Sequence, residues 1–288
     1  MAINGSDLIT RVLYGAIYVL LTGACTVISW QTTVLVLAVT AGFCAYEFMD
    51  MATKAGHRPF KSVGIIAAVL MPLAVSIKVI GVNAVALCLA IAFLAAVACL
   101  VRFVLNEEGT VEDVALTIFG YLYVGLCLSA FILLRQHVPG LGGGIMCLLV
   151  LLSVWMNDAF AYLGGSAFGK HKFSPRISPK KTWEGVYGGI FFAMLLGWGL
   201  SYDFIWNLFG IDLHEGLRLS TLQWIGLGLV VSIFSTYGDL IESLVKRGVG
   251  VKDSGNLLPG HGGLWDRFDS LILATPAALC YLVLCSML

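Results

Sequence analysis

The hydrophobic residues of this chain are gathered into long, nearly uninterrupted runs instead of alternating with polar residues. A helix needs about 20 mostly apolar residues to cross a bilayer. Stretches of that kind lie between polar or Gly/Pro breaks at residues 12–30, 33–50, 62–80, 83–104, 114–134, 144–165, 184–206, 221–241 and 267–287. The pattern therefore predicts an all-α integral membrane protein with about nine transmembrane helices.

Composition supports lipid as the solvent for much of the chain. Of 288 residues, 59% are hydrophobic and 12% are charged, against about a quarter charged in a typical soluble domain. The net charge of zero gives no electrostatic case for nucleic-acid binding. The eight cysteines lie in apolar runs without a CxxC pair, which predicts small hydrophobic side chains and no disulfide framework. The spacings Gly165/Gly169 and Gly185/Gly189 suit close helix packing in lipid.

Lysine and arginine predict the orientation of the spans, because these residues favour the cytoplasmic side. If the N-terminus is cytoplasmic, only Lys78, Arg135 and Arg218 fall on the opposite side. This bias favours an odd number of spans. It predicts a cytoplasmic N-terminus, a C-terminus on the opposite side, and two basic loops that face the cytoplasm.

Acidic residues gather at the cytoplasmic ends of the last predicted spans. Asp158 lies near the end of the sixth span, Asp239 and Glu242 close the eighth, and Asp266 and Asp269 open the ninth. An ionised carboxylate costs about 3 kcal/mol at the centre of a membrane helix and less near the interface. Several together would repel one another unless a cation or a polar cavity offsets the charge. The pattern therefore predicts a functional site.

The stretch from Tyr237 to Ser270 is the densest in polar residues. If the eighth helix continues past the interface, one helix face presents Asp239, Glu242, Ser243 and Lys246. A Gly-rich loop follows over residues 248–264. Such a loop can wrap an anion with backbone N–H groups. Basic side chains flank it: Lys246, Arg247, Lys252, His261 and Arg267. Carboxylates and basic groups around one loop suit a metal-bound polyphosphate.

A second basic stretch runs from Asp158 to Gly185. Its basic residues stand among Gly, Ser and Pro: Lys170, His171, Lys172, Arg176, Lys180 and Lys181. They could bind anionic lipid headgroups or nucleotide phosphates, or only anchor a cytoplasmic loop. Glu47 and Asp50, at the end of the second span, are interpreted as solvated helix termini.

The segment from Ser243 to Asp269 resembles the signature of the phosphatidate cytidylyltransferase (CDP-diacylglycerol synthase) family. The matching positions are Ser243, Lys246, Arg247, Lys252, Asp253, Pro259, His261, Gly262, Gly263, Asp266, Arg267 and Asp269. Upstream, Gly238-Asp239 and the stretch DAFAYLGG…FGKHK…SPKKTWEG also look like the family. The resemblance is firm from about Asp158 onward. It suggests one polytopic membrane domain over residues 1–288, with variable N-terminal helices over 1–140 and the catalytic helices and loops over 141–288.

The resemblance implies a nine-helix membrane fold, a homodimer, and a polar cavity open to the cytoplasm and the bilayer. It implies a two-cation centre with Mg²⁺ as one ion and with Asp239 and Asp266 as ligands, while Asp158 and Asp269 match positions in or beside the cavity. Lys246 and Arg267 join the two aspartates as expected catalytic residues. The expected substrate and nucleotide contacts are Ser178, Lys180, Lys181, Ser243, Arg247, Lys252, Asp253, His261, Gly262 and Gly263.

The activity implied by the resemblance is transfer of CMP from CTP to phosphatidic acid, which gives CDP-diacylglycerol and pyrophosphate. A CTP-dependent polyprenol or phytol kinase is one alternative, although attack by an alcohol should need a base. A CDP-archaeol-type synthase differs mainly in its lipid. A more distant alternative is an ion or lipid transporter, which predicts acidic residues at the bilayer midplane or inverted repeats.

Overall fold

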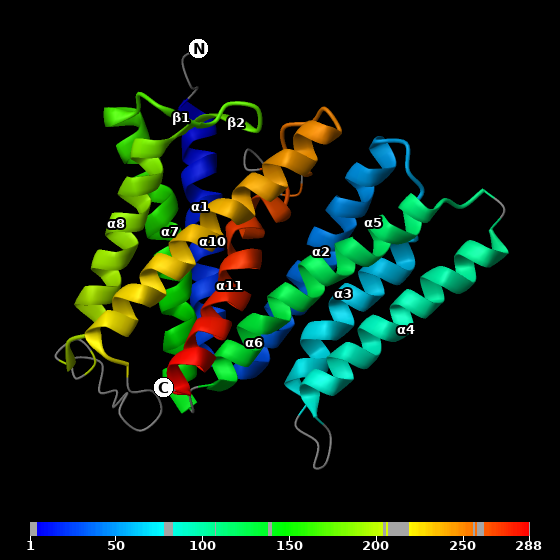
Figure 1. Cartoon of the computed structure of the whole chain (residues 1–288), viewed down its shortest axis with the longest axis horizontal. Helices are drawn as coiled ribbons and strands as arrows, with labels where there is room; N and C mark the ends of the chain where they lie inside the picture. Colours follow the sequence, from blue (N-terminus) through cyan, green and yellow to red (C-terminus); the bar gives the residue numbers. More distant parts are fainter. Residues whose placement is uncertain are drawn as a thin grey trace. The chain divides into compact units, whose positions relative to one another are not determined.

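The computed structural model of the chain describes residues 5–77, 83–106, 108–137, 140–203, 206, 219–255, 257 and 262–287. The chain divides into two compact units (Figure 1). The first unit contains Met1–Ile132 and Val245–Phe268, and the second contains Leu133–Leu244 and Asp269–Leu288. The predicted division near residue 140 is a different one, and it stays a prediction.

Helices make up almost all of the first unit. In chain order they are α1 (Gly5–Ile28), α2 (Trp30–Lys54), α3 (Lys61–Ser76), α4 (Ala84–Leu105), α5 (Val111–Tyr121), the π-helical turn η1 (Leu122–Leu126) and the first part of α6 (Cys127–His137). Polar residues cap several of them. Ser29 accepts a hydrogen bond from the Thr32 N–H at the start of α2, and Thr110 forms a capping box with Asp113 at the start of α5.

Helix α3 is the packing centre of the first unit, since it contacts α2, α4, α5 and η1. Small residues allow the close approach: a Cβ added at Gly125 in η1 would lie 2.7 Å from the Cα of Ala68. The side chains of α4 are mostly exposed, as expected for a helix that faces lipid. The apolar pattern of the sequence therefore produces a helical layer with one face available to the bilayer.

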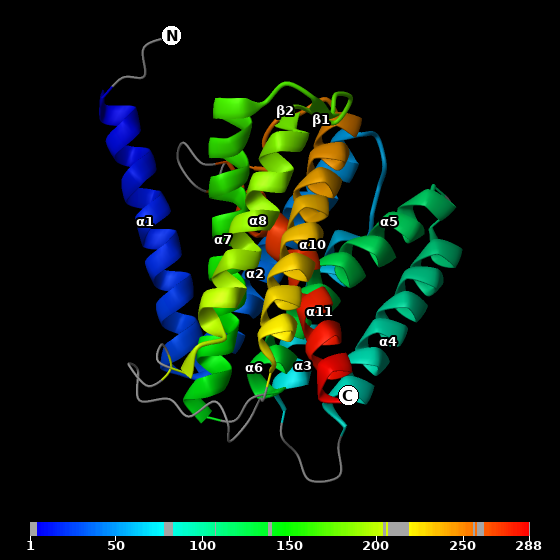
Figure 2. The same ribbon diagram turned by 60° about the vertical axis from the view of Figure 1, so that its left-hand side comes forward.

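The described part of the second unit consists of four helices and a hairpin, together with the end of α6. Its elements are α7 (Gly140–Phe168), β1 (Lys172–Ser174), β2 (Ser178–Thr182), α8 (Trp183–Leu200), α10 (Thr221–Gly248, in this unit through Leu244) and α11 (Trp265–Ser286, in this unit from Asp269). Antiparallel β1 and β2 pair with Lys172 opposite Thr182. The hairpin contacts the helices that flank it in the sequence (Figure 2).

Each of the nine predicted segments overlaps helical residues in the described part of the chain, and the fifth covers α5, η1 and α6. Among the described residues, six helices are long and apolar enough to cross a membrane: Trp30–Lys54, Ala84–Leu105, Val111–His137, Gly142–Phe168, Thr221–Gly248 and Trp265–Ser286. The predicted all-α membrane class is thus confirmed, with the hairpin as a local exception, while the count of nine spans stays a prediction. The eight cysteines all lie in the described part of the chain, and the structure pairs none of them in a disulfide.

Glycines bring α7 and α8 into close contact, and the predicted spacings Gly165/Gly169 and Gly185/Gly189 begin in these two helices. We expect Gly185→Ala to lower the free energy of unfolding by about 1–3 kcal/mol. The reason is that the added Cβ would lie 2.5 Å from the carbonyl oxygen of Ala161 and 3.2 Å from the Cα of Gly165. Thermal unfolding in one detergent measures the change. Gly199→Ala is the control in the same helix, because nothing lies within 4 Å of its added Cβ. Equal midpoints for both variants would contradict the packing argument.

Candidate active site

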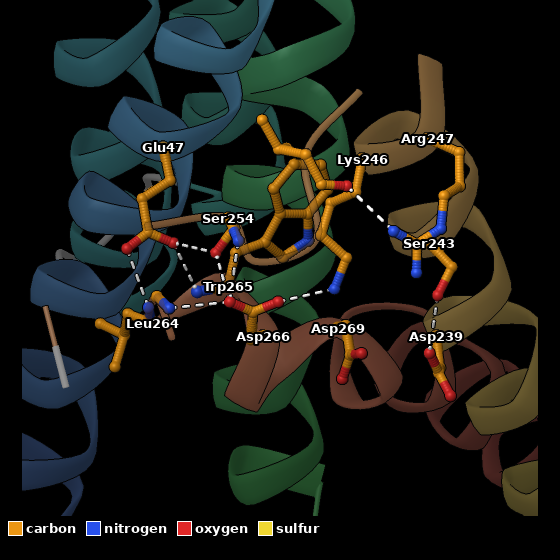
Figure 3. A network of polar contacts seen from close by, with 12 residues as sticks. Glu47, Asp239, Ser243, Lys246, Arg247, Ser254, Leu264, Trp265, Asp266 and Asp269 are labelled. Carbon is orange, nitrogen blue, oxygen red and sulfur yellow. Dashed lines mark hydrogen bonds and ion pairs between the residues drawn. The ribbon is translucent and has the colours of Figure 1, made fainter. Parts of the chain in front are cut away.

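An ion pair in the first unit joins the end of α10 to the start of α11. Lys246 Nζ lies 2.6 Å from Asp266 Oδ1, and the two side chains are only 11% and 7% exposed (Figure 3). The i to i+3 and i+4 periodicity of α10 turns Lys246 inward, while Arg247 stays exposed and donates to the carbonyl oxygen of Val251. Lys246 and Asp266, two of the predicted catalytic residues, are therefore direct partners.

The Gly-rich loop fits closely around the carboxylate of Asp266. Its Oδ2 accepts hydrogen bonds from the backbone N–H groups of Ser254 at 2.9 Å and Gly263 at 2.7 Å. Gly262 has φ of 80°, and a Cβ there would lie 2.5 Å from Asp266 Oδ2. The positive φ of Gly262 thus lets the loop approach Asp266 closely, and the N–H of Gly263 donates to its carboxylate.

Three carboxylates meet in the second unit. Asp239 and Glu242 lie one turn apart on α10, Asp269 lies on α11, and one oxygen of each is within 4.8 Å of the others. Gly238 permits this approach, since a Cβ there would lie 2.5 Å from the carbonyl oxygen of Asp269 and 3.1 Å from the Cα of Ser270. Glu242 is fully buried. Its place beside the other two carboxylates goes beyond the predicted metal ligands, which did not include Glu242.

The hairpin supplies a cation to this acidic group. Lys181, at the end of β2, places Nζ 2.6 Å from Asp239 Oδ2, and Ser243 Oγ donates to Asp239 Oδ1 at 3.3 Å. Asp158 on α7 interacts electrostatically with both Asp239 and Lys181. The second unit therefore brings together five of the residues predicted for the site: Asp158, Lys181, Asp239, Ser243 and Asp269.

Asn157, the residue before Asp158, is the centre of a buried polar network. The amide nitrogen of Asn157 donates to Asp158 Oδ1, and it also lies 3.4 Å from the hydroxyls of Ser235 and Thr236. Ser232 donates to the amide oxygen of Asn157. Because buried polar groups are costly unless they are hydrogen-bonded, this network fixes α7 against α10 at the depth of Asp158.

The acidic group fits a divalent cation by its chemistry. Carboxylate oxygens are the ligands that Mg²⁺ and Ca²⁺ prefer. Three carboxylates this close repel one another, and burial of Glu242 adds a desolvation cost. A bound cation would offset both of these costs. The group Asp239, Glu242 and Asp269 could therefore hold a metal ion.

The other predicted contact residues differ in their exposure to solvent. Lys180, Lys252 and Asp253 are exposed, Ser178 and Arg267 are partly buried, and His261 and Pro259 lie outside the described residues. The exposed basic side chains remain available to an anionic ligand, so their role as phosphate contacts stays a prediction.

The interpretation of Glu47 as a solvated helix terminus is wrong. This carboxylate is 5% exposed and accepts hydrogen bonds from the hydroxyl of Ser254 and from the backbone N–H groups of Leu264 and Trp265. Asp50, one turn further along α2, instead forms ion pairs with Lys54 and Lys61. One signal could have found Glu47: it lies inside the predicted apolar span, where an acidic residue indicates a polar partner.

Comparisons with known proteins find relatives that share one name. The chain is 38% identical over 167 residues to a phosphatidate cytidylyltransferase of Thermotoga maritima, which covers 58% of each protein. Enzymes of the same name from Staphylococcus aureus and Staphylococcus epidermidis are 40% and 41% identical over 168 and 164 residues, or 57% of each chain. The chain thus spans somewhat more than half the length of the curated relatives it matches. The profile of the cytidylyltransferase family matches residues 9–285, and the chain therefore belongs to that family.

Proposed function

We propose that this chain transfers CMP from CTP to phosphatidic acid, releasing pyrophosphate and forming CDP-diacylglycerol. The observation that carries the proposal is the acidic group of Asp239, Glu242 and Asp269 with Lys181 beside it, in a member of the cytidylyltransferase family. The names of the relatives supply the lipid substrate. The chemistry is an attack of a phosphate oxygen of phosphatidic acid on the α-phosphorus of CTP, with cleavage of the bond between that phosphorus and the oxygen bridging it to the β-phosphorus.

This reaction needs charge neutralisation more than it needs a base. A phosphate monoester has a second pKa near 6, so the nucleophile is already largely ionised at neutral pH. Two anions must nevertheless meet. Mg²⁺ bound by Asp239, Asp269 and Glu242 would supply positive charge at the nucleotide phosphates. Asp266 as a further metal ligand, and a second cation, are proposed from the family resemblance alone.

Several basic residues and one serine would hold the phosphates of CTP and phosphatidic acid. We assign this role to Lys180, Lys181 and Ser178 of the hairpin, and to the basic residues around the Gly-rich loop: Lys246, Arg247, Lys252, His261 and Arg267. Preorganised cations that face the transferred group and the leaving pyrophosphate stabilise the charge of the transition state. Asp158 would orient Lys181, since the two interact electrostatically.

We further propose the membrane arrangement that the apolar runs, the basic residues and the family resemblance together imply. It comprises nine spans, a cytoplasmic N-terminus, a polar cavity open to the cytoplasm, and a homodimer as the functional form. The bias of lysine and arginine supports the orientation. Six helices of sufficient length and apolarity in the described ranges support the membrane setting.

The test is a labelling experiment with purified protein in detergent and phosphatidic acid. We expect α-labelled CTP to give labelled lipid in the presence of Mg²⁺, and excess EDTA to abolish the labelling. γ-Labelled CTP should give labelled pyrophosphate and no labelled lipid. Label transferred from the γ-phosphate to an isoprenoid alcohol would establish the kinase alternative. Activity only with an ether-linked isoprenoid glycerol phosphate would establish the archaeol-type alternative.

A further inference from the structure

Glu47 is a buried carboxylate in the membrane helix α2 that contacts a segment more than 200 residues away in the sequence. Its Oε1 accepts a hydrogen bond from the Leu264 N–H at 2.9 Å. Its Oε2 accepts one from the Trp265 N–H at 2.9 Å and one from Ser254 Oγ at 2.7 Å. Figure 3 shows this carboxylate pointing at the loop and at the start of α11.

These contacts provide acceptors for backbone N–H groups at the start of α11. The first N–H groups of a helix have no partner within it, and they carry partial positive charge. Leu264 and Trp265 supply such groups, because α11 begins at Trp265. Glu47 therefore caps α11 from another helix, with charge-assisted hydrogen bonds that are stronger than neutral ones.

The loop is shaped to this carboxylate. A Cβ added at Gly255 would lie 2.7 Å from Glu47 Oε1, and one at Gly263 would contact both Glu47 and Ser254. The residue after Glu47 strengthens the contact, since the ring of Phe48 packs 5.5 Å from that of Trp265, which is fully buried. Both ends of the Gly-rich loop are thus held against α2.

Ser254 connects Glu47 to Asp266. Its Oγ lies 2.7 Å from Glu47 Oε2 and 3.0 Å from Asp266 Oδ2, while its backbone N–H donates to Asp266 Oδ2. A hydroxyl carries a single hydrogen, so Oγ can donate to only one carboxylate at a time. Because the N–H already serves Asp266, donation to Glu47 leaves both carboxylates with a donor. Asp266 in turn pairs with Lys246.

We propose that Glu47 is a positioning residue, which fixes the Gly-rich loop and the start of α11 so that Asp266 and Lys246 are held in their reactive arrangement. The inference rests on the proposed function for its catalytic consequence. It assigns a role in the reaction to a helix of the N-terminal part of the chain, outside the signature segment. It predicts that loss of Glu47 acts through Asp266 and not through contact with substrate.

Glu47→Gln tests the proposal, because the amide has the same size and retains one acceptor oxygen. We expect kcat to fall about 10-fold to 100-fold, since small displacements of a catalytic group have effects of that order. KM for CTP should change less than about 3-fold. Glu47→Ala should lower kcat further. Asp50→Asn is the matched control on α2, one turn away, and should keep wild-type kinetics.

Hydrogen exchange separates positioning from a general loss of folded protein. Peptides spanning residues 250–268 should exchange faster in Glu47→Gln, while peptides of α4 should exchange at the wild-type rate. Unchanged exchange in the loop, or a kcat equal to wild type, would overturn the proposal. This measurement needs no turnover. If the wild-type protein makes no CDP-diacylglycerol, the proposed function fails, and the exchange of the loop still decides whether Glu47 holds it.

Discussion

Asp239→Asn is expected to lower kcat for CDP-diacylglycerol formation about 1000-fold, the order of loss seen when a group that stabilises transition-state charge is removed. Asp239 belongs to the acidic group and also contacts the hairpin. It lies within 4.8 Å of the Glu242 and Asp269 carboxylates and forms an ion pair with Lys181. Asparagine removes the negative charge while it keeps the size of the side chain. Steady-state kinetics across a range of Mg²⁺ concentrations measures the effect.

The Mg²⁺ dependence shows whether the loss arises at a metal site. If Asp239 is a ligand, the concentration that gives half-maximal activity should rise in Asp239→Asn. Asp203→Asn is the control in the same unit, since Asp203 is exposed and lies outside the site. Wild-type activity in Asp239→Asn would remove the metal centre from this position, although the reaction itself could still stand.

The membrane helices could be predicted from the sequence because their signal is local. An apolar run between polar breaks determines where a spanning helix forms, whatever it packs against. The contact of α7 with α8 was also predictable, because glycine spacing on one face indicates close approach in lipid. The acidic site residues were found for a similar reason: a carboxylate at the end of an apolar span needs a partner.

The hairpin and the role of Glu47 were not predicted, and both depend on distant contacts. The strands β1 and β2 are three and five residues long, and their sequences KFS and SPKKT carry no alternating apolar pattern. The hairpin is defined by its packing on α7 and α8. Glu47 has partners 207 to 218 residues away. A periodicity within one helix cannot indicate which distant backbone groups a buried carboxylate will meet.

Lys246→Met is expected to destabilise the protein strongly, because it removes one partner of a buried ion pair, the ammonium that lies 2.6 Å from the carboxylate of Asp266. Removal of one partner of a buried ion pair typically costs about 3–5 kcal/mol. Asp266 and Lys246 are 7% and 11% exposed in their side chains, so water can replace little of the lost interaction. The thermal unfolding midpoint in detergent should fall by roughly 5–10 °C. The double variant Lys246→Met/Asp266→Asn should recover part of this loss, because it removes both charges of the buried pair.

Lys181→Met tests how much burial contributes to the stability that an ion pair provides. The Lys181–Asp239 pair has the same 2.6 Å separation as the Lys246–Asp266 pair, but its side chains are 23% and 30% exposed. Water can solvate the carboxylate of Asp239 when its partner is lost, and ion pairs with access to solvent contribute about 0–1 kcal/mol. Lys181→Met should therefore shift the unfolding midpoint much less than Lys246→Met, although both lysines are expected to contact phosphates. Equal shifts would mean that the distance between the charges, and not their burial, sets the stability of these pairs.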